Sequence, residues 1–501
     1  MNLILNLRIV GVVAAMLAIF QVPTLALAWH FDEEIIPFVL TLLTTVTFTL
    51  MAVLTRRTLF LGMQARDGVV AVIMGWVMMI LLGALPYYFS GIMSGVDAIF
   101  ESASGFTTTG STILADIERL PQGLLFWRST TQWIGGMGIL LLAVAIMPYL
   151  GIGGAQIMKA EMPGFKKDRI APRVTDTARI LWSIYLGLTL LAGICYWLAG
   201  MPALDAVHHA FTTISIGGFS PKNASMGAYP PAVQWCSMLF MILAGINFVL
   251  YYRLLFKREW GPLGDEELHW YLLTILGVAV FCCLEAFAST ASNDLHDALL
   301  HGLFQAVSLV TNTGYANVDW ESWPLYVQII LMTIAIPGAM SGSTTGGIKM
   351  VRAIVLFKVL GAGINRILTP ERVIAVKING KRIPPDLLDA VMALGFAITL
   401  AMAVATITLV AMGLDLQTAY SAALTTLINV GPGIGMVGPM DNFGAIPDNG
   451  KLMLVFLMLT GRLEVFTVLI LFVPHFWKPD AILTTNPSVE TSLRISKRKT
   501  E

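Results

Sequence analysis

The sequence predicts an all-α integral membrane protein: four outer helix–pore half-helix–inner helix repeats around a pseudo-fourfold pore, preceded by two N-terminal transmembrane helices. The chain of 501 residues is 56% apolar and only 12% charged. A soluble protein of this length needs more charge to cover its surface, whereas lipid-facing helices need almost none. Apolar stretches of about 20 residues, enough to cross the hydrocarbon core of a bilayer, recur along the chain.

Long apolar stretches define the predicted spans. They lie at 8–28, 36–55, 67–89, 123–149, 178–199, 231–255, 268–290, 325–361, 389–412 and 450–474. The first is too long for the core of a signal peptide and no clear cleavage site follows it, so we interpret it as a retained anchor. The predicted units are two additional N-terminal helices (1–58), repeat one (59–177), repeat two (178–261), repeat three with an intramembrane gate loop (262–388), and repeat four with a cytoplasmic tail (389–501).

Charge is distributed unevenly between the loops. Basic residues gather in 151–177, in 362–388 and in the C-terminal tail, whereas loops on the opposite side carry carboxylates such as Asp32, Glu33 and Glu34. Basic loops face the cytoplasm in most membrane proteins. Both termini are therefore expected to be cytoplasmic. The net charge is zero and nothing in the sequence indicates a nucleic-acid partner.

Four segments on the outward side are too apolar for ordinary loops and too short to span a membrane. They are 96–110, 204–217, 303–314 and 418–431, and each has a half-length helical pattern followed by Ser, Thr or Asn and then glycine. Their glycines recur about every hundred residues, which indicates an internal repeat. One such segment alone is typical of a helix-packing or turn motif. Four in phase favour a pore, because non-helical backbone at membrane depth must be buried in protein or line water.

The ends of these segments form a candidate selectivity filter. Half-helices that direct their carboxyl ends at one centre stabilise a cation there. Glycine suits a ring of carbonyl oxygens because the backbone often requires positive φ. No charged side chain precedes the glycines, so carbonyl oxygens are expected to coordinate the ion. The candidate filter residues are Thr108, Thr109, Gly110, Ser215, Ile216, Gly217, Asn312, Thr313, Gly314, Asn429, Val430 and Gly431.

The eighth span is interrupted at 337–347. Proline removes a backbone donor and glycines weaken a helix, so a break is predicted, with a loop in the ion path below the filter. A kinked, closely packed helix is the alternative. An arginine within the membrane needs a partner, and the loop carbonyls could pair with Arg462. The candidate gate residues are Gly338, Gly342, Ser343, Thr344, Thr345, Gly346, Gly347, Lys349 and Arg462.

No pattern indicates catalysis. The four cysteines lie in apolar spans, where thiols are usually small apolar fillers rather than disulfides or metal ligands. His208 and His209 are adjacent in a half-helix, but no further ligands accompany them. No Ser/His/Asp or paired-carboxylate constellation is visible. An enzyme and a resident metal or cofactor are therefore not expected.

Several motifs together carry a family resemblance over nearly the whole chain. They are Gln132–Gly138, Lys159–Gly164, Ile216–Ser220, Gly342–Lys349 and Gly461–Phe466, and Val430–Gly433 is close to the filter core of tetrameric potassium channels. The sequence resembles the TrkH branch of the Trk/Ktr/HKT superfamily of potassium transporters. Glycine at all four filter positions looks like the potassium-selective members; sodium-preferring plant relatives place serine in the first repeat.

This resemblance implies potassium as the transported ion and a homodimer in the bacterial inner membrane. It also implies that the loop and Arg462 form the gate, and that a cytosolic TrkA-type nucleotide-binding ring regulates transport. ATP or NAD(H) would then bind that partner, with no cofactor in this chain. The basic segments 151–177, with Lys166, Lys167 and Arg169, and 362–388 are candidate docking surfaces or plain determinants of topology.

The leading hypothesis is gated potassium uptake under the control of that partner. The alternatives are a secondary potassium symporter coupled to protons or sodium, and a membrane scaffold or receptor that retains a pore fold.

Overall fold

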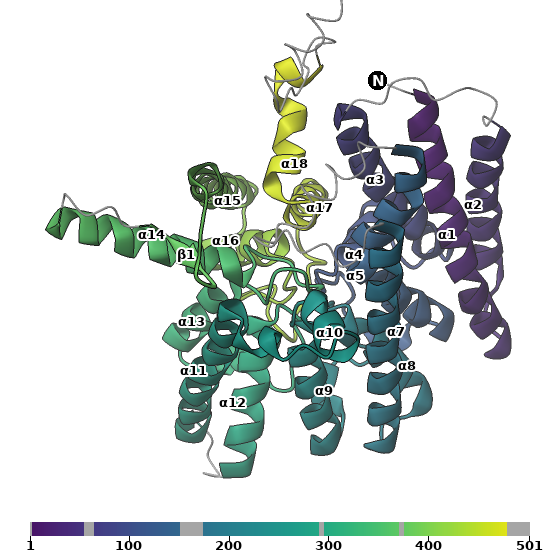
Figure 1. Ribbon diagram of the computed structural model, residues 1–501. Coiled ribbons are helices and arrows are strands. Elements are labelled where there is room, and N and C mark those ends of the chain that lie inside the picture. The colour runs from purple at the N-terminus through teal and green to yellow at the C-terminus, as the bar shows by residue number, and fades with distance from the viewer. Residues whose placement is uncertain (1–2, 55–64, 151–173, 290–294, 370–374, 478–501) are drawn as a thin grey trace, which may run out of the picture.

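Helices make up most of the described chain (Figure 1). The computed structural model describes residues 3–54, 65–150, 174–289, 295–369 and 375–477. Six of the described helices are long and apolar enough to cross a membrane, or up to eight if each bent pair counts as one span. The protein is an all-α membrane protein. Lys166, Lys167 and Arg169 lie outside the described residues.

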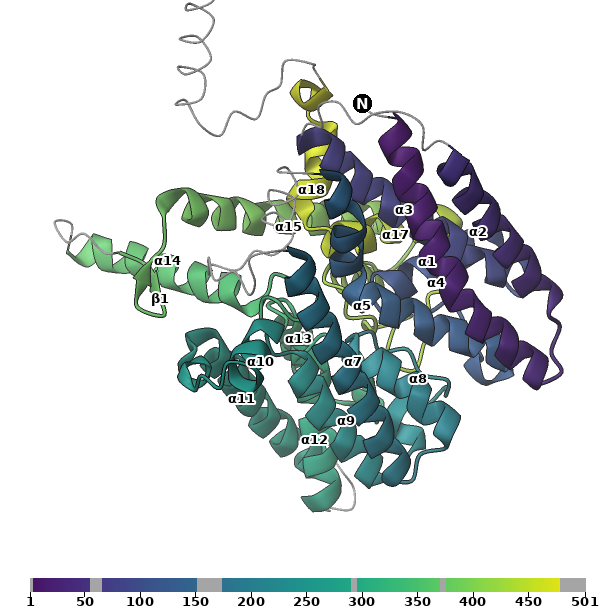
Figure 2. The same cartoon turned by 45° about the vertical axis from the view of Figure 1, so that its right-hand side comes forward.

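Two helices precede the repeated elements. α1 (Leu3–His30) and α2 (Ile36–Leu54) pack against each other and against α3, at one edge of the molecule (Figure 2). The turn between them reaches α5, because the Glu33 carboxylate accepts the backbone N–H groups of Gln122 and Gly123. A carboxylate here satisfies two orphan donors at the start of α5, and its negative charge interacts favourably with the positive end of the helix dipole.

The remaining helices follow the order outer helix, half-helix, inner helix four times along the chain. The outer helices are α3 (Ala65–Phe89), α7 (Val174–Leu198), α11 (Glu266–Ser289) and α15 (Pro385–Ala411). The half-helices are α4 (Gly95–Phe106), α8 (Ala203–Ile214), α12 (Leu295–Val310) and α16 (Leu416–Leu427). The inner helices are α5 (Gln122–Leu150), α9 with α10 (Pro231–Ala244, Phe248–Leu255), α13 with α14 (Leu325–Ala335, Met350–Leu368) and α17 with α18 (Asp448–Arg462, Val465–Leu469).

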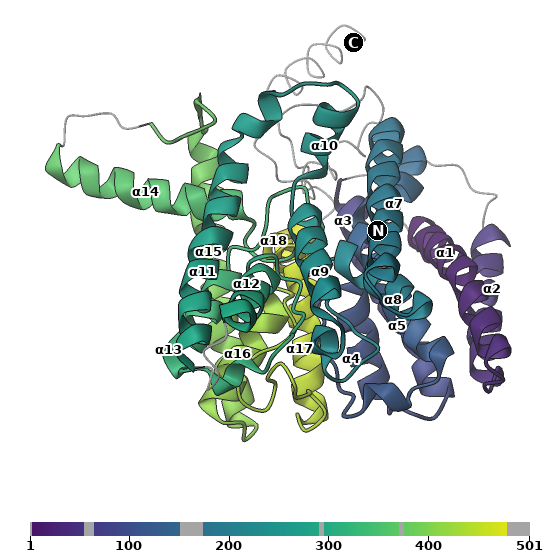
Figure 3. The ribbon, with the colours of Figure 1, turned by 90° about the horizontal axis from the view of Figure 1, so that it is seen from below.

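The half-helices lie between neighbouring units around the middle of the molecule (Figure 3). Each packs against the outer and inner helices next to it in sequence, and α8, α12 and α4 also contact the inner helices α5, α9 and α17 of another unit. The contact between α17 and α4 joins the last unit to the first. Large apolar side chains on the outer helices, such as Leu190, Leu276 and Phe396, are exposed. They are suited to lipid.

The inner helices are interrupted more often than the sequence predicts. The predicted break in 325–361 is present, with α13 ending at Ala335 and α14 beginning at Met350. The spans 231–255 and 450–474, predicted as continuous, are bent by 90° and 117°. In the first of these, Asn247 begins α10 by accepting the N–H of Val249 through its side chain at 2.9 Å. In the second, Glu464 adopts φ +65° before α18.

A β hairpin and α14 form a small second core. α14 projects from the bundle (Figure 1), and the antiparallel strands β1 (Lys377–Ile378) and β2 (Lys381–Arg382) lie beside it. Six buried apolar residues join these elements to the start of α15: Val351, Val355, Val376, Ile378, Ile383 and Val391. Short 3₁₀ helices complete the described elements: η2 (Ile117–Arg119), η4 (Ser225–Ala228), η5 (Gly261–Gly264), η6 (Trp320–Ser322), η7 (Ile470–Phe472) and η8 (Pro474–Trp477).

Candidate ion pathway

All four half-helices end in the same backbone conformation. A residue with left-handed φ follows each helix, and a glycine with positive φ comes two residues later. The first set is Thr108 (54°), Ile216 (57°), Asn312 (65°) and Asn429 (55°), and the second is Gly110 (87°), Gly218 (79°), Gly314 (79°) and Gly431 (100°). The residue between them donates its N–H back into the helix, as in a Schellman ending, to Ser104, Thr212, Ser308 and Thr425.

This repeated conformation corrects the register expected for the second unit. The sequence places Gly217 in line with Gly110, but the glycine with positive φ is Gly218. Gly217 instead occupies the position of Thr109, since its N–H bonds to Thr212 O as that of Thr109 bonds to Ser104 O. Two adjacent glycines allow either register by spacing alone, and the hydrogen bonds of the helix end decide between them.

The four segments form a closed ring. A β-carbon on Gly110 would overlap the carbonyl oxygen of Gly217, and one on Gly218 would overlap that of Thr313. One on Gly314 would overlap Val430 O, and one on Gly431 would lie 2.8 Å from Thr109 O. Each glycine therefore touches the residue before the next glycine, and the fourth contacts the first unit again. The candidate filter residues thus meet at one place, where only hydrogen fits as the glycine side chain.

Side-chain hydrogen bonds tie the ring to the inner helices α5 and α17 and to itself. Gln132 on α5 donates to Gly217 O at 2.6 Å and accepts the N–H of Phe219 at 3.0 Å. Asn429 donates to Thr109 Oγ1 at 2.8 Å and to Met458 O at 3.0 Å. These contacts fix the backbone orientation at Gly217 in the second segment and the side-chain orientation of Asn429 in the fourth. Gln132 begins the motif Gln132–Gly138, but no sequence pattern indicates its bonds to the ring.

The interrupted stretch 336–349 lies against the carboxyl ends of three half-helices. Thr344 Oγ1 donates to Ile214 O at 3.0 Å, and Thr345 Oγ1 donates to Thr311 O at 3.0 Å. A β-carbon on Gly346 would lie 2.7 Å from Ile428 O. The loop therefore occupies the inner side of the ring, where the half-helix dipoles are negative.

Arg462, the last residue of α17, connects this loop to the first inner helix. Its guanidinium is buried and donates to Thr344 O at 2.8 Å, to Gly135 O at 2.8 Å and to Gly136 O at 3.3 Å. Loop and helix carbonyls, rather than a carboxylate, are thus its partners. The acid two residues on, Glu464, binds Arg352 through both oxygens at 2.9 Å and lies 3.7 Å from Lys349 Nζ.

A buried acid that the sequence did not single out links the loop to the start of α14. Glu267 on α11 accepts the N–H of Ser341 at 2.7 Å and its hydroxyl at 2.9 Å, and it accepts the N–H of Val351 at 3.2 Å. Its side chain lies within the protein, with the residue 6% exposed. Glu267 therefore satisfies an orphan donor in the first turn of α14 and ties this turn to Ser341 within the loop.

The break in the second inner helix supports the loop from a further side. Met340 N donates to Gly245 O at 3.1 Å, and Phe248 N donates to Gly342 O at 3.0 Å. The carbonyl and N–H that α9 and α10 leave free at their break thus bond to the loop. The two interruptions stabilise each other.

The buried histidines belong to a hydrogen-bond network. His208 Nδ1 lies 2.9 Å from Ser129 Oγ, and His209 Nε2 lies 3.2 Å from Ser220 Oγ. Within the described ranges, no three His, Cys, Asp or Glu side chains gather as a metal site.

Comparison with known proteins agrees with this arrangement. The family model TrkH, described as a cation transport protein, matches residues 36–478. The chain belongs to the TrkH family. It is 39% identical over 424 residues to the Trk system potassium uptake protein TrkH of Salmonella typhimurium, covering 83% of this chain and 87% of that protein. It is 36% identical over 480 residues to TrkH of Vibrio parahaemolyticus, covering 94% of this chain and 99% of that protein.

A solved structure shares the fold. The crystal structure of the potassium transporter TrkH from Vibrio parahaemolyticus superposes with a TM-score of 0.85 at 34% identity, covering 95% of this chain and 100% of that one. The predicted fold class and family are confirmed, and this is a transport protein rather than an enzyme.

Proposed function

We propose that this protein mediates gated potassium uptake across the bacterial inner membrane, through a filter formed by the four half-helix ends. The observation that carries the proposal is the closed ring, in which each positive-φ glycine touches the carbonyl-bearing residue before the next glycine. Uncharged carbonyl oxygens suit a weakly hydrated monovalent cation. The names of the relatives at 36–39% identity support potassium as that cation.

The filter assignment predicts the effect of a side chain in the ring. Gly110→Ser is expected to lower potassium-over-sodium selectivity, because its β-carbon would displace Gly217 O from the ring. Bi-ionic reversal potentials of the purified protein in planar bilayers measure this ratio. Gly91→Ser is the matched control, since Gly91 also has positive φ (68°) but has nothing within 4 Å of the added carbon. A wild-type ratio in Gly110→Ser would contradict the assignment.

The proposed gate is the loop Gly338–Gly347 with Lys349 and Arg462. Its support is the loop's contact with three half-helix ends and the bond from Arg462 to Thr344 O. A cation leaving the filter would meet the loop and then a buried positive charge. Proton- or sodium-coupled symport is the alternative. Dependence of potassium flux on a proton or sodium gradient at fixed voltage would support symport.

Partners are part of the proposal. A homodimer and a cytosolic TrkA-type ring that binds ATP or NAD(H) are consistent with the relatives' description as Trk system proteins. Both termini would be cytoplasmic. The segment 375–388 of the proposed docking region contains the β hairpin, whose Asn379 bonds to Glu266 at the start of α11. Since the next residue, Glu267, holds the gate loop, a partner at the hairpin would act close to the gate.

A further inference from the structure

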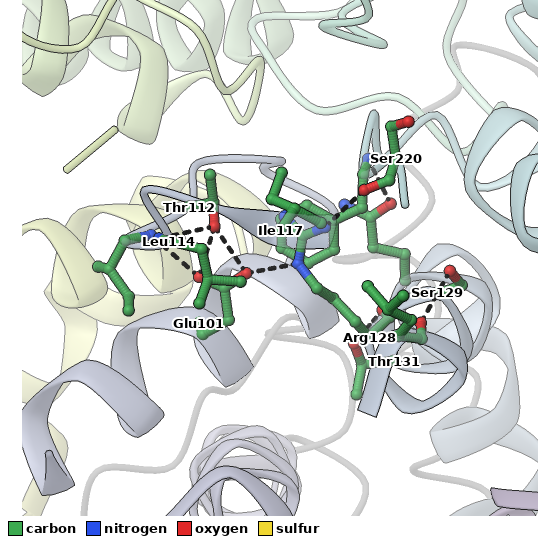
Figure 4. A network of polar contacts seen from close by, with 12 residues as sticks. Glu101, Thr112, Leu114, Ile117, Arg128, Ser129, Thr131 and Ser220 are labelled. Atoms are coloured by element: carbon green, nitrogen blue, oxygen red, sulfur yellow. Dashed lines mark hydrogen bonds and ion pairs between the residues drawn. The ribbon is translucent and has the colours of Figure 1, made fainter. Parts of the chain in front are cut away.

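A buried ion pair lies behind the ring, between the first half-helix and the first inner helix (Figure 4). Glu101 on α4 and Arg128 on α5 are 2.6 Å apart, and their side chains are 0% and 3% exposed. Removing two charges from water is costly, so such a pair is weak evidence for stability alone. Its other contacts indicate what it does.

The carboxylate holds the non-helical backbone that follows Gly110. We call 111–113 and its counterpart in the second unit, 219–220, the first and second filter strands, although neither belongs to a β-sheet. Both oxygens of Glu101 accept the Thr112 hydroxyl, at 2.9 and 3.0 Å, and one accepts the N–H of Ile113 at 3.1 Å. Thr112 is two residues beyond Gly110. The position of this strand, and with it the direction of the preceding carbonyls, therefore depends on Glu101.

The guanidinium holds the corresponding strand of the second unit. Arg128 donates to Ser220 O at 2.9 Å, and its guanidinium carbon lies 3.6 Å from the centre of the Phe219 ring. One turn along the same face of α5, Gln132 binds Gly217 O and the N–H of Phe219. The pair thus joins two filter strands that are adjacent in the ring.

The other units use uncharged groups at the same place. Counted back from the positive-φ glycine, the residues that correspond to Glu101 are His209, Gln305 and Ala422. In the third unit a chain of amides serves the purpose, since Gln305 donates to Asn317 at 3.1 Å and Asn317 donates to Gln234 at 2.8 Å. A neutral contact can therefore support a filter strand in this fold. Among these four corresponding positions, the charged pair belongs to the first unit, and Arg128 extends it to Ser220 of the second unit.

We infer that Glu101 and Arg128 form a positioning pair that determines ion selectivity by fixing the separation of the first and second filter strands. The inference rests on the proposed function, because it assigns selectivity to the ring. Neither residue is proposed to touch the ion. Both act through the backbone that follows Gly110 and Gly218.

The test compares charge-removing variants of similar size. Glu101→Gln, Arg128→Gln and the double variant are reconstituted in planar bilayers, and the potassium-to-sodium permeability ratio is measured from bi-ionic reversal potentials. Each single variant is expected to lower the ratio on the order of tenfold, and the double variant by less than the product, as for residues in direct contact. The double variant leaves neutral amides like those around Gln305 and no unpaired buried charge, so it loses less selectivity than two independent substitutions would.

Two further variants separate positioning from folding. Thr112→Val removes the hydroxyl that binds Glu101 but keeps the charges paired, and it is expected to lower the ratio in the same direction by a smaller factor. Lys222→Gln, which removes a partly exposed cation of an outward loop, is the control and should keep the wild-type ratio. A merely structural pair would lower the folded yield and the thermal stability but leave the ratio unchanged in protein that folds.

The outcomes are distinct. Wild-type permeability ratios in the folded single variants overturn the inference. So does a double variant whose ratio falls by the full product of the two single effects. If the single variants do not fold, wild-type ratios in Thr112→Val and in the double variant overturn it. A changed ratio in Gly110→Ser with unchanged ratios in all pair variants rejects this inference and leaves the proposed filter intact. An unchanged ratio in Gly110→Ser rejects the filter itself.

Discussion

Replacing Arg462 by alanine tests whether the loop and the arginine act as one gate. The variant removes the bond to Thr344 O, which measures 2.8 Å and has a charged donor. Such a bond contributes about 1.5–3 kcal/mol, so its loss favours release of the loop by about 10- to 150-fold, since every 1.4 kcal/mol is tenfold. Removing the charge also lowers the barrier to a passing cation, by on the order of 1–4 kcal/mol at short range and intermediate dielectric.

Both effects raise flux. Potassium flux into proteoliposomes, per correctly inserted protein, is measured for wild type, Arg462→Ala, deletion of 339–345, and the combination. Each single change is expected to raise flux by about tenfold or more, and the combination much less than additively, because both remove the same barrier. Arg253→Ala, at a partly exposed ion pair with Glu259, controls for loss of an arginine. Reduced flux in Arg462→Ala at normal protein levels would refute the gate.

The remaining predictions concern two other carboxylates. Glu267→Gln leaves fewer acceptors for the donors of Ser341 and Val351, and each lost bond is worth about 1.5–3 kcal/mol, so basal potassium flux should rise. Glu266→Gln, which loosens the hairpin instead, is the control, and equal flux in the two variants would argue against a tether. Asp415→Ala should lower the stability of the protein by about 1 kcal/mol, because Asp415 caps α16 through the N–H of Thr418 at 2.9 Å. The same bond holds the pKa of Asp415 below its usual range. The stability that the carboxylate contributes is therefore present at neutral pH, and it is lost as the pH falls through that lowered pKa, below about 4. Thermal unfolding in detergent should show Asp415→Asn stable and less sensitive to acid; a variant as acid-sensitive as wild type would contradict this assignment.

Local patterns were sufficient to predict the main elements. Apolar runs of spanning length predict the outer helices, because burial in lipid depends on composition and length alone. A half-length helix followed by Ser, Thr or Asn and glycine predicts each half-helix with its left-handed ending, as at Gly110, because a left-handed turn restricts the residue type. Proline and clustered glycines predict the break before Met350. These signals lie within a few residues of the feature that they predict.

Breaks and register without such local signals were predicted incorrectly. The bends after Ala244 and at Glu464 contain no proline. At the first bend, backbone groups that the helix leaves free bond to the stretch 336–349, and at the second the Glu464 side chain binds Arg352. The shift from Gly217 to Gly218 is of the same kind, since either glycine can adopt positive φ. The hydrogen bonds that end α8 and the contact with Thr313 select one of them.

The sequence by itself determined that this is a membrane protein of four repeated units with half-helices and a gate-like interruption, because those features depend on length, composition and backbone preference. Only the tertiary structure decided which groups meet. Arg462 could have paired with any of several carbonyls or acids, and no local sequence pattern marks Glu101 and Arg128 as partners. Their partners are carried by other helices, and a buried charge is stabilised by the groups that the fold places around it rather than by its neighbours in the chain.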